Sequence, residues 1–270
     1  MMVKSVLRAG LVFLLALLVF FISADGATEN DGQPAIRNAL FELPEEAQKM
    51  RAIFNEAVNR EVVENTDYLN QLSQDAARTF LSLNEEARRS QYFLYVDRNP
   101  GEQIAFVGFF NAADGSVAII GLDKISSGDE KRKGFFITPT GVFKNSPDII
   151  GYRALGTKNE KGWLGLGVKD SRVWDFGWQK TVKNGKVKTI RLLLHATDPI
   201  FGEKRLGKTD SMGCIRISGK LNRFLDHYGL LDREYEARKN GDKKIFWVLK
   251  ANREQVIFAG QYLLVGDSAQ

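Results

Sequence analysis

Cysteine and histidine are scarce in this chain of 270 residues, which has one cysteine and two histidines. A structural zinc site needs four such ligands, so Cys₄ and Cys₂His₂ sites are excluded, and we expect no metal. One cysteine also excludes an intrachain disulfide framework. The single thiol, Cys214, is therefore a buried small side chain, a partner in an intermolecular bond, or a reactive group.

Basic blocks, internal repeats and low-complexity segments are also missing from the sequence. The chain has 38 Lys and Arg against 33 Asp and Glu, a net charge of +5 that is spread along its length. Without a basic cluster or zinc-finger spacing, we expect no binding to nucleic acid. With 44% hydrophobic and 26% charged residues, the composition excludes a largely disordered chain and a polytopic membrane protein.

The first residues have the features of an export signal. Lys4 and Arg8 precede an unbroken apolar run from Leu11 to Ile22, and small residues follow between positions 23 and 27. The run is shorter than the roughly 20 residues of a spanning helix. We predict that residues 1–26 are an export signal or an uncleaved membrane anchor. The protein would then work in the periplasm or cell envelope, with membrane contact only through this segment.

Residues 27–90 have the periodicity of helices. Pro44, Glu45 and Glu46 are typical of a helix start. Two apolar stripes follow at helical spacing: Met50, Ile53, Phe54, Ala57 and Val58, then Leu69, Leu72, Ala76 and Phe80, the second stretch ending in the charged residues 85–89. We predict an α-helical N-terminal region whose apolar stripes pack in a core.

Residues 91–270 are predicted to be one mainly β domain with short helices. Short apolar runs between turn residues indicate strands at 92–96, 104–110, 117–121, 178–183, 186–194, 245–249 and 262–265. The pair Asn184-Gly185 is typical of a two-residue hairpin turn. One helix is expected over 221–228, closed by Gly229.

Chemistry-bearing residues gather around the single cysteine. His195 ends the apolar run 192–194, and Cys214 and Arg216 share one face if residues 214–217 are extended. Positive charge favours the thiolate, which is the nucleophilic form of cysteine. A nearby histidine can hold that thiolate as an ion pair or accept its proton as a general base. The other histidine, His227, is expected at a helix end, where it faces the dipole and needs no catalytic role.

The backbone before the cysteine can supply an oxyanion hole. Gly213 allows a tight turn, so the N–H groups of Met212, Gly213 and Cys214 could point at one oxygen. Ser211 adds a small polar residue on the other side of Met212.

These residues resemble the signature of the L,D-transpeptidase catalytic domain (YkuD-type) family. The family pattern is a histidine, a gap of under twenty residues, then Ser-His-Gly-Cys, an apolar residue, and Arg or Asn. His195 matches the first histidine, Ser211, Gly213 and Cys214 match the second block, and Arg216 matches its arginine.

Two upstream segments extend the resemblance. Ser-Ser-Gly at 126–128 and Thr-Pro-Thr-Gly-Val-Phe at 138–143 resemble the family's Ser-x-Gly and Thr-Pro-x-Gly-x-Phe segments. The resemblance covers residues 92–249. The chain departs from the pattern at Met212, which replaces the second histidine, and at Ala196, which replaces a glycine.

The resemblance implies a β-rich sandwich with Cys214 in a cleft under the loop 197–210. Cys214 would attack the L,D-peptide bond of a peptidoglycan tetrapeptide stem and expel the terminal D-alanine. An amine of a neighbouring stem would resolve the thioester, with His195 as the base and no cofactor. Ser211, Arg216 and Ala196 would support the site or bind substrate.

Alternatives remain open at this point. The acyl-enzyme could meet water, which gives an L,D-carboxypeptidase, or serve to link an envelope lipoprotein to peptidoglycan or release it. The chain could also be a non-catalytic peptidoglycan-binding module, for which Met212 is the main argument.

Overall fold

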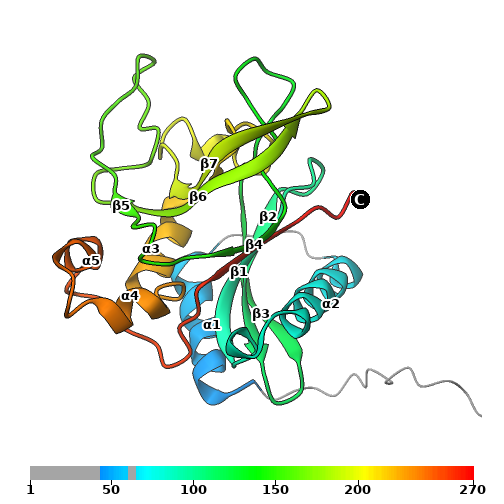
Figure 1. The fold of residues 1–270 in the computed structure, drawn as a ribbon, viewed down its shortest axis with the longest axis vertical. Coiled ribbons are helices and arrows are strands. Elements are labelled where there is room, and N and C mark those ends of the chain that lie inside the picture. The colour runs from blue at the N-terminus through cyan, green and yellow to red at the C-terminus, as the bar shows by residue number, and fades with distance from the viewer. Residues whose placement is uncertain (1–42, 60–64) are drawn as a thin grey trace, which may run out of the picture. The chain divides into compact units, whose positions relative to one another are not determined.

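The computed structural model describes residues 43–59 and 65–270, and this part of the chain contains nine strands in two sheets (Figure 1). The elements are α1 (Glu45–Ala57), α2 (Thr66–Ser82), η1 (Glu85–Ala87), β1 (Gln91–Asp97), β2 (Ile104–Asn111), β3 (Ser116–Lys124), β4 (Gly141–Lys144), β5 (Tyr152–Arg153), β6 (Arg172–Lys183), β7 (Lys186–Ala196), η2 (Glu203–Arg205), β8 (Ile215–Ile217), α3 (Gly219–His227), α4 (Arg233–Arg238), α5 (Lys243–Val248) and β9 (Tyr262–Gly266). The predicted export segment 1–26 lies outside the described residues. Within the described ranges, every helix is too short or too polar to cross a membrane.

The five-stranded sheet has the order β3-β2-β1-β9-β4. β1 is antiparallel to β2 and parallel to β9, so the last strand of the chain lies inside the sheet, between β1 and β4. All seven residues of β1 are buried, which explains its apolar sequence from Tyr92 to Val96. A strand of this kind needs a covering layer on both of its faces.

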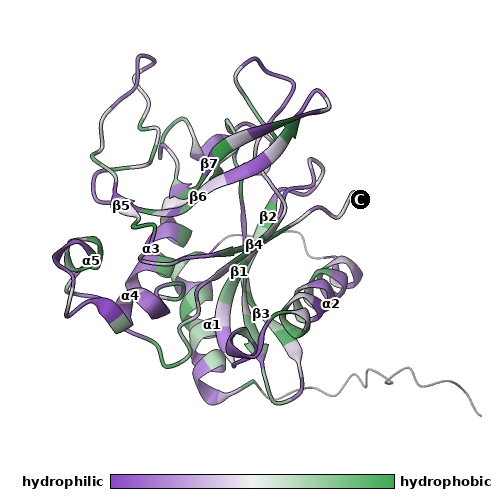
Figure 2. Cartoon of the chain, viewed as in Figure 1, coloured by the Kyte–Doolittle hydropathy of each residue, from purple (hydrophilic) through white to green (hydrophobic). Residues whose placement is uncertain are grey.

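Helix α2 covers one face of this sheet. Asn65 caps its N-terminus by accepting hydrogen bonds from the backbone N–H groups of Asp67 and Tyr68. The buried stripe Leu72, Ala76 and Phe80 packs on alternate strand residues, and the Phe80 ring stacks 4.7 Å from that of Phe110. Figure 2 shows α2 with its polar side turned outwards.

The other face of the sheet shares a core with the second sheet, which has the order β5-β6-β7-β8. The core contains strand residues from both sheets together with apolar residues of α1 and α3: Leu94, Val107, Trp174, Leu192, Leu194, Ile215, Ile217, Met50, Phe54, Phe224 and Leu225. The described residues therefore form a mixed α/β fold that is mostly sheet, in two layers, with a few short helices. Helices α1 and α2 lie within the predicted helical region 27–90, of which residues 27–42 and 60–64 are outside the described residues. Both helices belong to the same compact unit as the strands, Glu42–Gln270.

The long hairpin β6–β7 follows the sequence prediction and adds one irregularity. Asn184 and Gly185 have φ values of 50° and 69°, as a two-residue primed turn requires. Nearer the base of the hairpin, the register shifts between Asp175 and Trp178, where Gly177 has a φ of 74°. This bulge bends β6 beside the strand that carries His195.

One predicted strand is wrong. Residues 245–249 belong largely to the helix α5, because Asp242 caps it and the residues buried are Ile245, Val248 and Leu249. Phe246 and Trp247 are exposed, so the apolar run is not a buried strand. The second helix also ends earlier than predicted, at Ser82, and a separate short turn covers residues 85–87.

Candidate active site

The edge between β7 and β8 places three of the candidate residues on one face of the second sheet. The two strands are parallel, and His195 lies directly opposite Arg216. Ile215 and Ile217 are fully buried in the shared core. Strand alternation therefore turns Cys214, Arg216 and His195 to the opposite face.

His195 is held in one tautomer. The residue is 4% exposed, and its Nδ1 lies 2.6 Å from the carbonyl oxygen of Ala196. A carbonyl only accepts hydrogen bonds, so Nδ1 carries the proton and Nε2 carries the lone pair. Burial lowers the pKa of His195 to about 4, and the charge of Arg216 lowers it as well. The imidazole is therefore neutral at pH 7.

Cys214 lies immediately before β8 and is half-buried. Its thiol donates a hydrogen bond to the carbonyl oxygen of Arg191, at 3.7 Å. Burial raises the pKa of this thiol, against the opposing effects of the Leu193 backbone N–H and the Arg216 charge. Of the two alternatives left by the sequence, these pKa directions favour a neutral thiol and imidazole over an ion pair. Within the described residues, no direct hydrogen bond joins Cys214 to His195.

The backbone at the cysteine is fixed by a chain of hydrogen bonds. Thr138 Oγ1 donates to the carbonyl oxygen of Gly213 at 2.9 Å and accepts from the N–H of Gly128 at 2.8 Å. Gly128 has no room for a side chain, because a Cβ there would lie 1.9 Å from the carbonyl oxygen of Phe136. The upstream segments 126–128 and 138–143 are thus brought to the cysteine.

Ser211 restricts the predicted oxyanion hole. Its Oγ accepts from the Gly213 N–H at 3.0 Å and donates to the carbonyl oxygen of Cys214. The Gly213 N–H is therefore already occupied, which corrects the prediction that three successive groups serve one oxygen. In the described part of the chain, the N–H groups of Met212 and Cys214 have no protein acceptor, so these two stay as candidate donors.

The remaining predicted residues have simple positions. Ala196 is buried at the end of β7, and its carbonyl oxygen orients His195. Met212 is 57% exposed, so its side chain is not part of the packed site. His227 lies at the end of α3, with Nε2 3.4 Å from a carboxylate oxygen of Glu254.

A polar cluster on the β6 side of the cysteine was not predicted from the sequence. Asp175, buried at the bulge, forms an ion pair of 2.6 Å with Arg191, and the Arg191 guanidinium lies 6.0 Å from the Trp178 ring. Burial raises the pKa of Tyr152, and the charges of Asp175 and Cys214 raise it further. A sequence signal existed only for Asp175, a single acid within an apolar strand.

The loop 197–210, which was expected to lie over the cleft of Cys214, is held by hydrogen bonds near both of its ends. Asp198 accepts hydrogen bonds from the backbone N–H groups of Leu164, Ile200 and Phe201. At its far end, the N–H of Asp210 donates to the carbonyl oxygen of Ser127. These hydrogen bonds hold the loop in place where it begins and where it ends.

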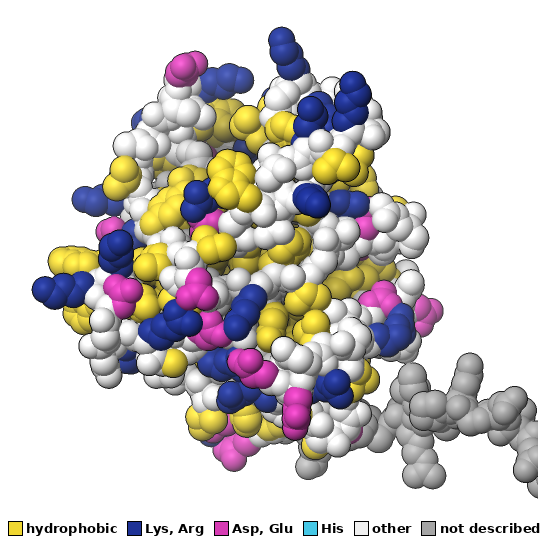
Figure 3. Space-filling model, viewed as in Figure 1, with side chains coloured by type: hydrophobic (Ala, Val, Ile, Leu, Met, Phe, Trp, Pro, Cys, Tyr) yellow, Lys and Arg dark blue, Asp and Glu magenta, His cyan; other side chains and the backbone are white. Residues whose placement is uncertain are grey.

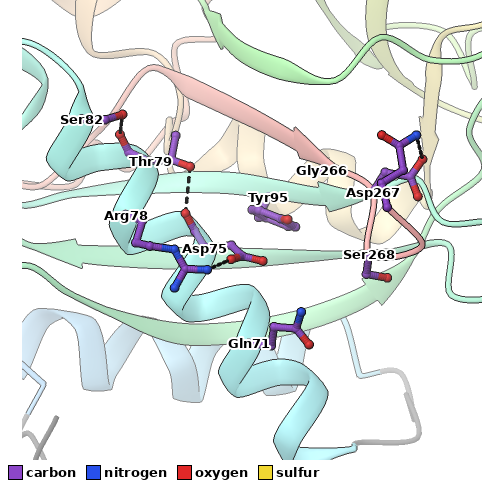
Figure 4. A pocket seen from close by; sticks show the side chains of 10 residues that line it. Gln71, Asp75, Arg78, Thr79, Ser82, Tyr95, Gly266, Asp267 and Ser268 are labelled. Atoms are coloured by element: carbon purple, nitrogen blue, oxygen red, sulfur yellow. Dashed lines mark hydrogen bonds and ion pairs between the residues drawn. The ribbon is translucent and has the colours of Figure 1, made fainter. Parts of the chain in front are cut away.

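A polar pocket of about 480 Å³ lies between α2 and the segment after β9 (Figure 4). Its charged side chains are paired: Arg78 with Asp75, and Asp267 with Arg98. Thr79 and Ser82 donate to backbone carbonyl groups of their own helix. This pocket offers no activated nucleophile or base, so the candidate active site is the β7–β8 edge.

The low pKa of His195 predicts a pH-dependent stability. Between pH 6.5 and about 4 the unfolded chain takes up a proton on this histidine and the folded protein does not. The free energy of unfolding should therefore fall as the pH falls through this window, by about 3 kcal/mol in total. Urea titrations at pH 7 and 4.5 should show a smaller fall for His195→Gln than for the wild type. An equal fall in His195→Gln would contradict the assignment, and His227→Gln is the control.

Comparison with known proteins adds no relative to this picture. No protein-family model matches the chain, and no curated protein matches it. What the site can do chemically follows from the contacts described above.

Proposed function

We propose that this protein is an exported cysteine acyltransferase that acts on peptidoglycan stem peptides, an L,D-transpeptidase with Cys214 as nucleophile. One observation carries the proposal. His195 donates a hydrogen bond from Nδ1 to the Ala196 carbonyl group, which leaves the lone pair on Nε2, and it lies on the face of the sheet that also carries Cys214. A buried base and the only thiol of the chain, on one face of a sheet, are the kind of pair that nucleophilic catalysis uses.

The first step forms a thioester. Nε2 of His195 accepts the thiol proton while Sγ attacks the carbonyl carbon of the third stem residue. Because both groups are neutral at rest, proton transfer accompanies the attack rather than preceding it. The C–N bond to the terminal D-alanine then breaks, and the imidazolium returns the proton to the leaving amine.

The second step regenerates the thiol. An amine of a neighbouring stem attacks the thioester, His195 accepts its proton, and the C–S bond breaks with the proton passing back to sulfur. In both steps the developing oxyanion would be met by the N–H groups of Met212 and Cys214. Each such donor contributes roughly 2.7–4 kcal/mol to the stability of the transition state.

The test is incubation of the protein, without its first 26 residues, with tetrapeptide muropeptides, followed by mass analysis. We expect a cross-linked dimer and free D-alanine. If tripeptide forms without dimer, the acyl acceptor is water rather than a neighbouring stem, and the protein is a carboxypeptidase. No product, and no thioester on intact-mass analysis, would overturn the proposal.

Met212 gives a prediction specific to this chain. The side chain is exposed, and only its N–H serves the oxyanion, so Met212→His should change kcat/KM by less than about tenfold. The same assay as above measures the effect. An increase of several orders of magnitude would mean that the native chain lacks an essential side chain, and it would support the non-catalytic binding module instead.

A further inference from the structure

Three arginines converge on one buried carboxylate next to the candidate nucleophile. Asp210 Oδ1 lies 2.7 Å from Nη1 of Arg132 and 2.5 Å from Nη2 of Arg205. Its Oδ2 lies 3.3 Å from Nη1 of Arg216. The arginines come from three different segments: the loop between β3 and β4, the short helix η2, and β8. We call these four residues the arginine cluster.

The cluster carries more positive than negative charge. One carboxylate offsets one of the three guanidinium charges. The Asp210 side chain is only 8% exposed, whereas those of Arg132 and Arg205 are 45% and 41% exposed. Burial lowers the pKa of Arg216; the charge of Asp210 raises it, and the charges of Arg205 and Arg132 lower it. The half-exposed guanidinium groups of Arg132 and Arg205 therefore keep N–H donors accessible to solvent, which is favourable for binding an anion.

The guanidinium groups are held in place before any ligand arrives. Arg132 lies 4.1 Å from the Phe135 ring, and Lys183 of the β6–β7 hairpin donates to carbonyl oxygens of this loop. Arg205 lies 5.3 Å from the Trp163 ring. Figure 3 shows basic side chains crowding the end of the molecule formed by the β3–β4 loop and the hairpin. Such preorganisation reduces the entropy that binding costs.

The arginine cluster lies close to the candidate nucleophile, Cys214. Arg216 follows Cys214 by two positions on the same face of the strand, a spacing of about 7 Å. In a stem peptide, the carboxylate of the leaving residue lies three bonds from the carbonyl carbon that Cys214 would attack. A diamino acid at the third position of the stem carries a second carboxylate, at the end of its side chain. This carboxylate belongs to the residue whose carbonyl carbon Cys214 would attack.

We propose that Arg132, Arg205 and Arg216, arranged around Asp210, bind a carboxylate of the donor stem peptide beside the scissile bond. This inference rests on the proposed function and names the group that the site selects. Carboxylate recognition would orient the peptide so that its carbonyl carbon meets Sγ. It would also make the site discriminate against amidated stems.

The experiment uses direct binding, so that it does not depend on turnover. Isothermal titration of Cys214→Ala would use the tetrapeptide L-Ala-γ-D-Glu-diaminopimelyl-D-Ala in three forms: free acid, C-terminal amide, and side-chain amide. We expect one of the two amides to bind at least about tenfold more weakly than the acid. The amide form that binds more weakly identifies the carboxylate that the arginine cluster binds. Equal affinity of all three forms would overturn the proposal.

Variants separate binding from a purely structural role. Arg132→Gln combined with Arg205→Gln, in the Cys214→Ala background, should abolish the preference for the acid while leaving affinity for the weaker amide unchanged. Lys133→Gln, an exposed cation of the same loop, is the matched control and should keep the preference. The milder Arg132→Lys should keep part of it if the double variant fails to fold. An equal loss for acid and amide would mean that the cluster only stabilises the fold.

The two proposals fail in different ways. If the wild type turns over acid and amide peptides with equal kcat/KM, the function stands and the carboxylate site is wrong. If the acid binds selectively but no peptide is turned over, the carboxylate site stands and the transpeptidase function is wrong.

Discussion

Cys214→Ala is expected to abolish the formation of cross-linked and trimmed muropeptides. The chain has no other thiol, and loss of the nucleophile of an acyl-transfer enzyme costs on the order of 10⁶ in kcat. Muropeptide products measured by mass would fall below detection. Sγ donates a long hydrogen bond to the Arg191 carbonyl group and is only half-buried, so little stability should be lost.

The thermal midpoint serves as the control for this variant. We expect Cys214→Ala to melt within about 4 °C of the wild type, which corresponds to roughly 1 kcal/mol for a domain of this size. Substantial remaining activity in a folded Cys214→Ala protein would show that the thioester mechanism is wrong.

His195→Ala should lower kcat/KM by about 10²–10⁴, the usual contribution of a general base. In the wild type, kcat/KM should rise as the pH increases through about 4, because the base is the neutral imidazole that forms above its lowered pKa. His195→Ala should lack this rise of kcat/KM at low pH, the acid limb of the pH profile. Rates of thioester formation between pH 3.5 and 8, followed by intact mass, measure both effects.

Two further variants make this result specific. His195→Gln keeps more of the buried volume and should lose the same acid limb, which separates loss of the base from a packing defect. His227→Ala removes the other histidine, which lies partly exposed at the end of α3, and should leave both rate and profile unchanged. An acid limb that persists in His195→Gln would assign the base to another group.

The sequence predicted those parts of the fold that depend on local patterns. The hairpin turn at Asn184-Gly185 follows from the need for positive φ at both positions, and the strands β1, β2 and β3 follow from their apolar runs. Residues 245–249 were mistaken for a strand because a short apolar run has no diagnostic period. Only the positions of the buried residues distinguish the helix α5 from a strand.

The candidate site was predictable where it rests on neighbouring residues. The spacing of Cys214 and Arg216 on one face follows from strand alternation, and His195 was the available base at a strand end. The charged groups around them were not predictable. Arg132 meets Asp210 across 78 positions of sequence, and this contact depends on how two loops are packed.

The number of N–H donors in the oxyanion hole could not be predicted from the sequence. Three successive N–H groups near a glycine suggested three donors, but the Ser211 hydroxyl group is within reach of one of them. Side-chain to backbone hydrogen bonds over two residues are common for serine, and they compete with any other use of the N–H group.

The position of β9 constrains the order in which the protein can assemble. Its partners β1 and β4 flank it in the sheet, and the ion pair between Arg98 and Asp267 spans 169 positions of sequence. A chain that emerges N-terminus first must therefore hold β1 with one unpaired edge until residues 262–266 are also present. Contacts of such long range slow folding. If the protein is exported as proposed, the first sheet closes only after residues 262–266 have crossed the membrane. A chaperone that binds the unpaired edge of β1 until then would protect the chain from aggregation.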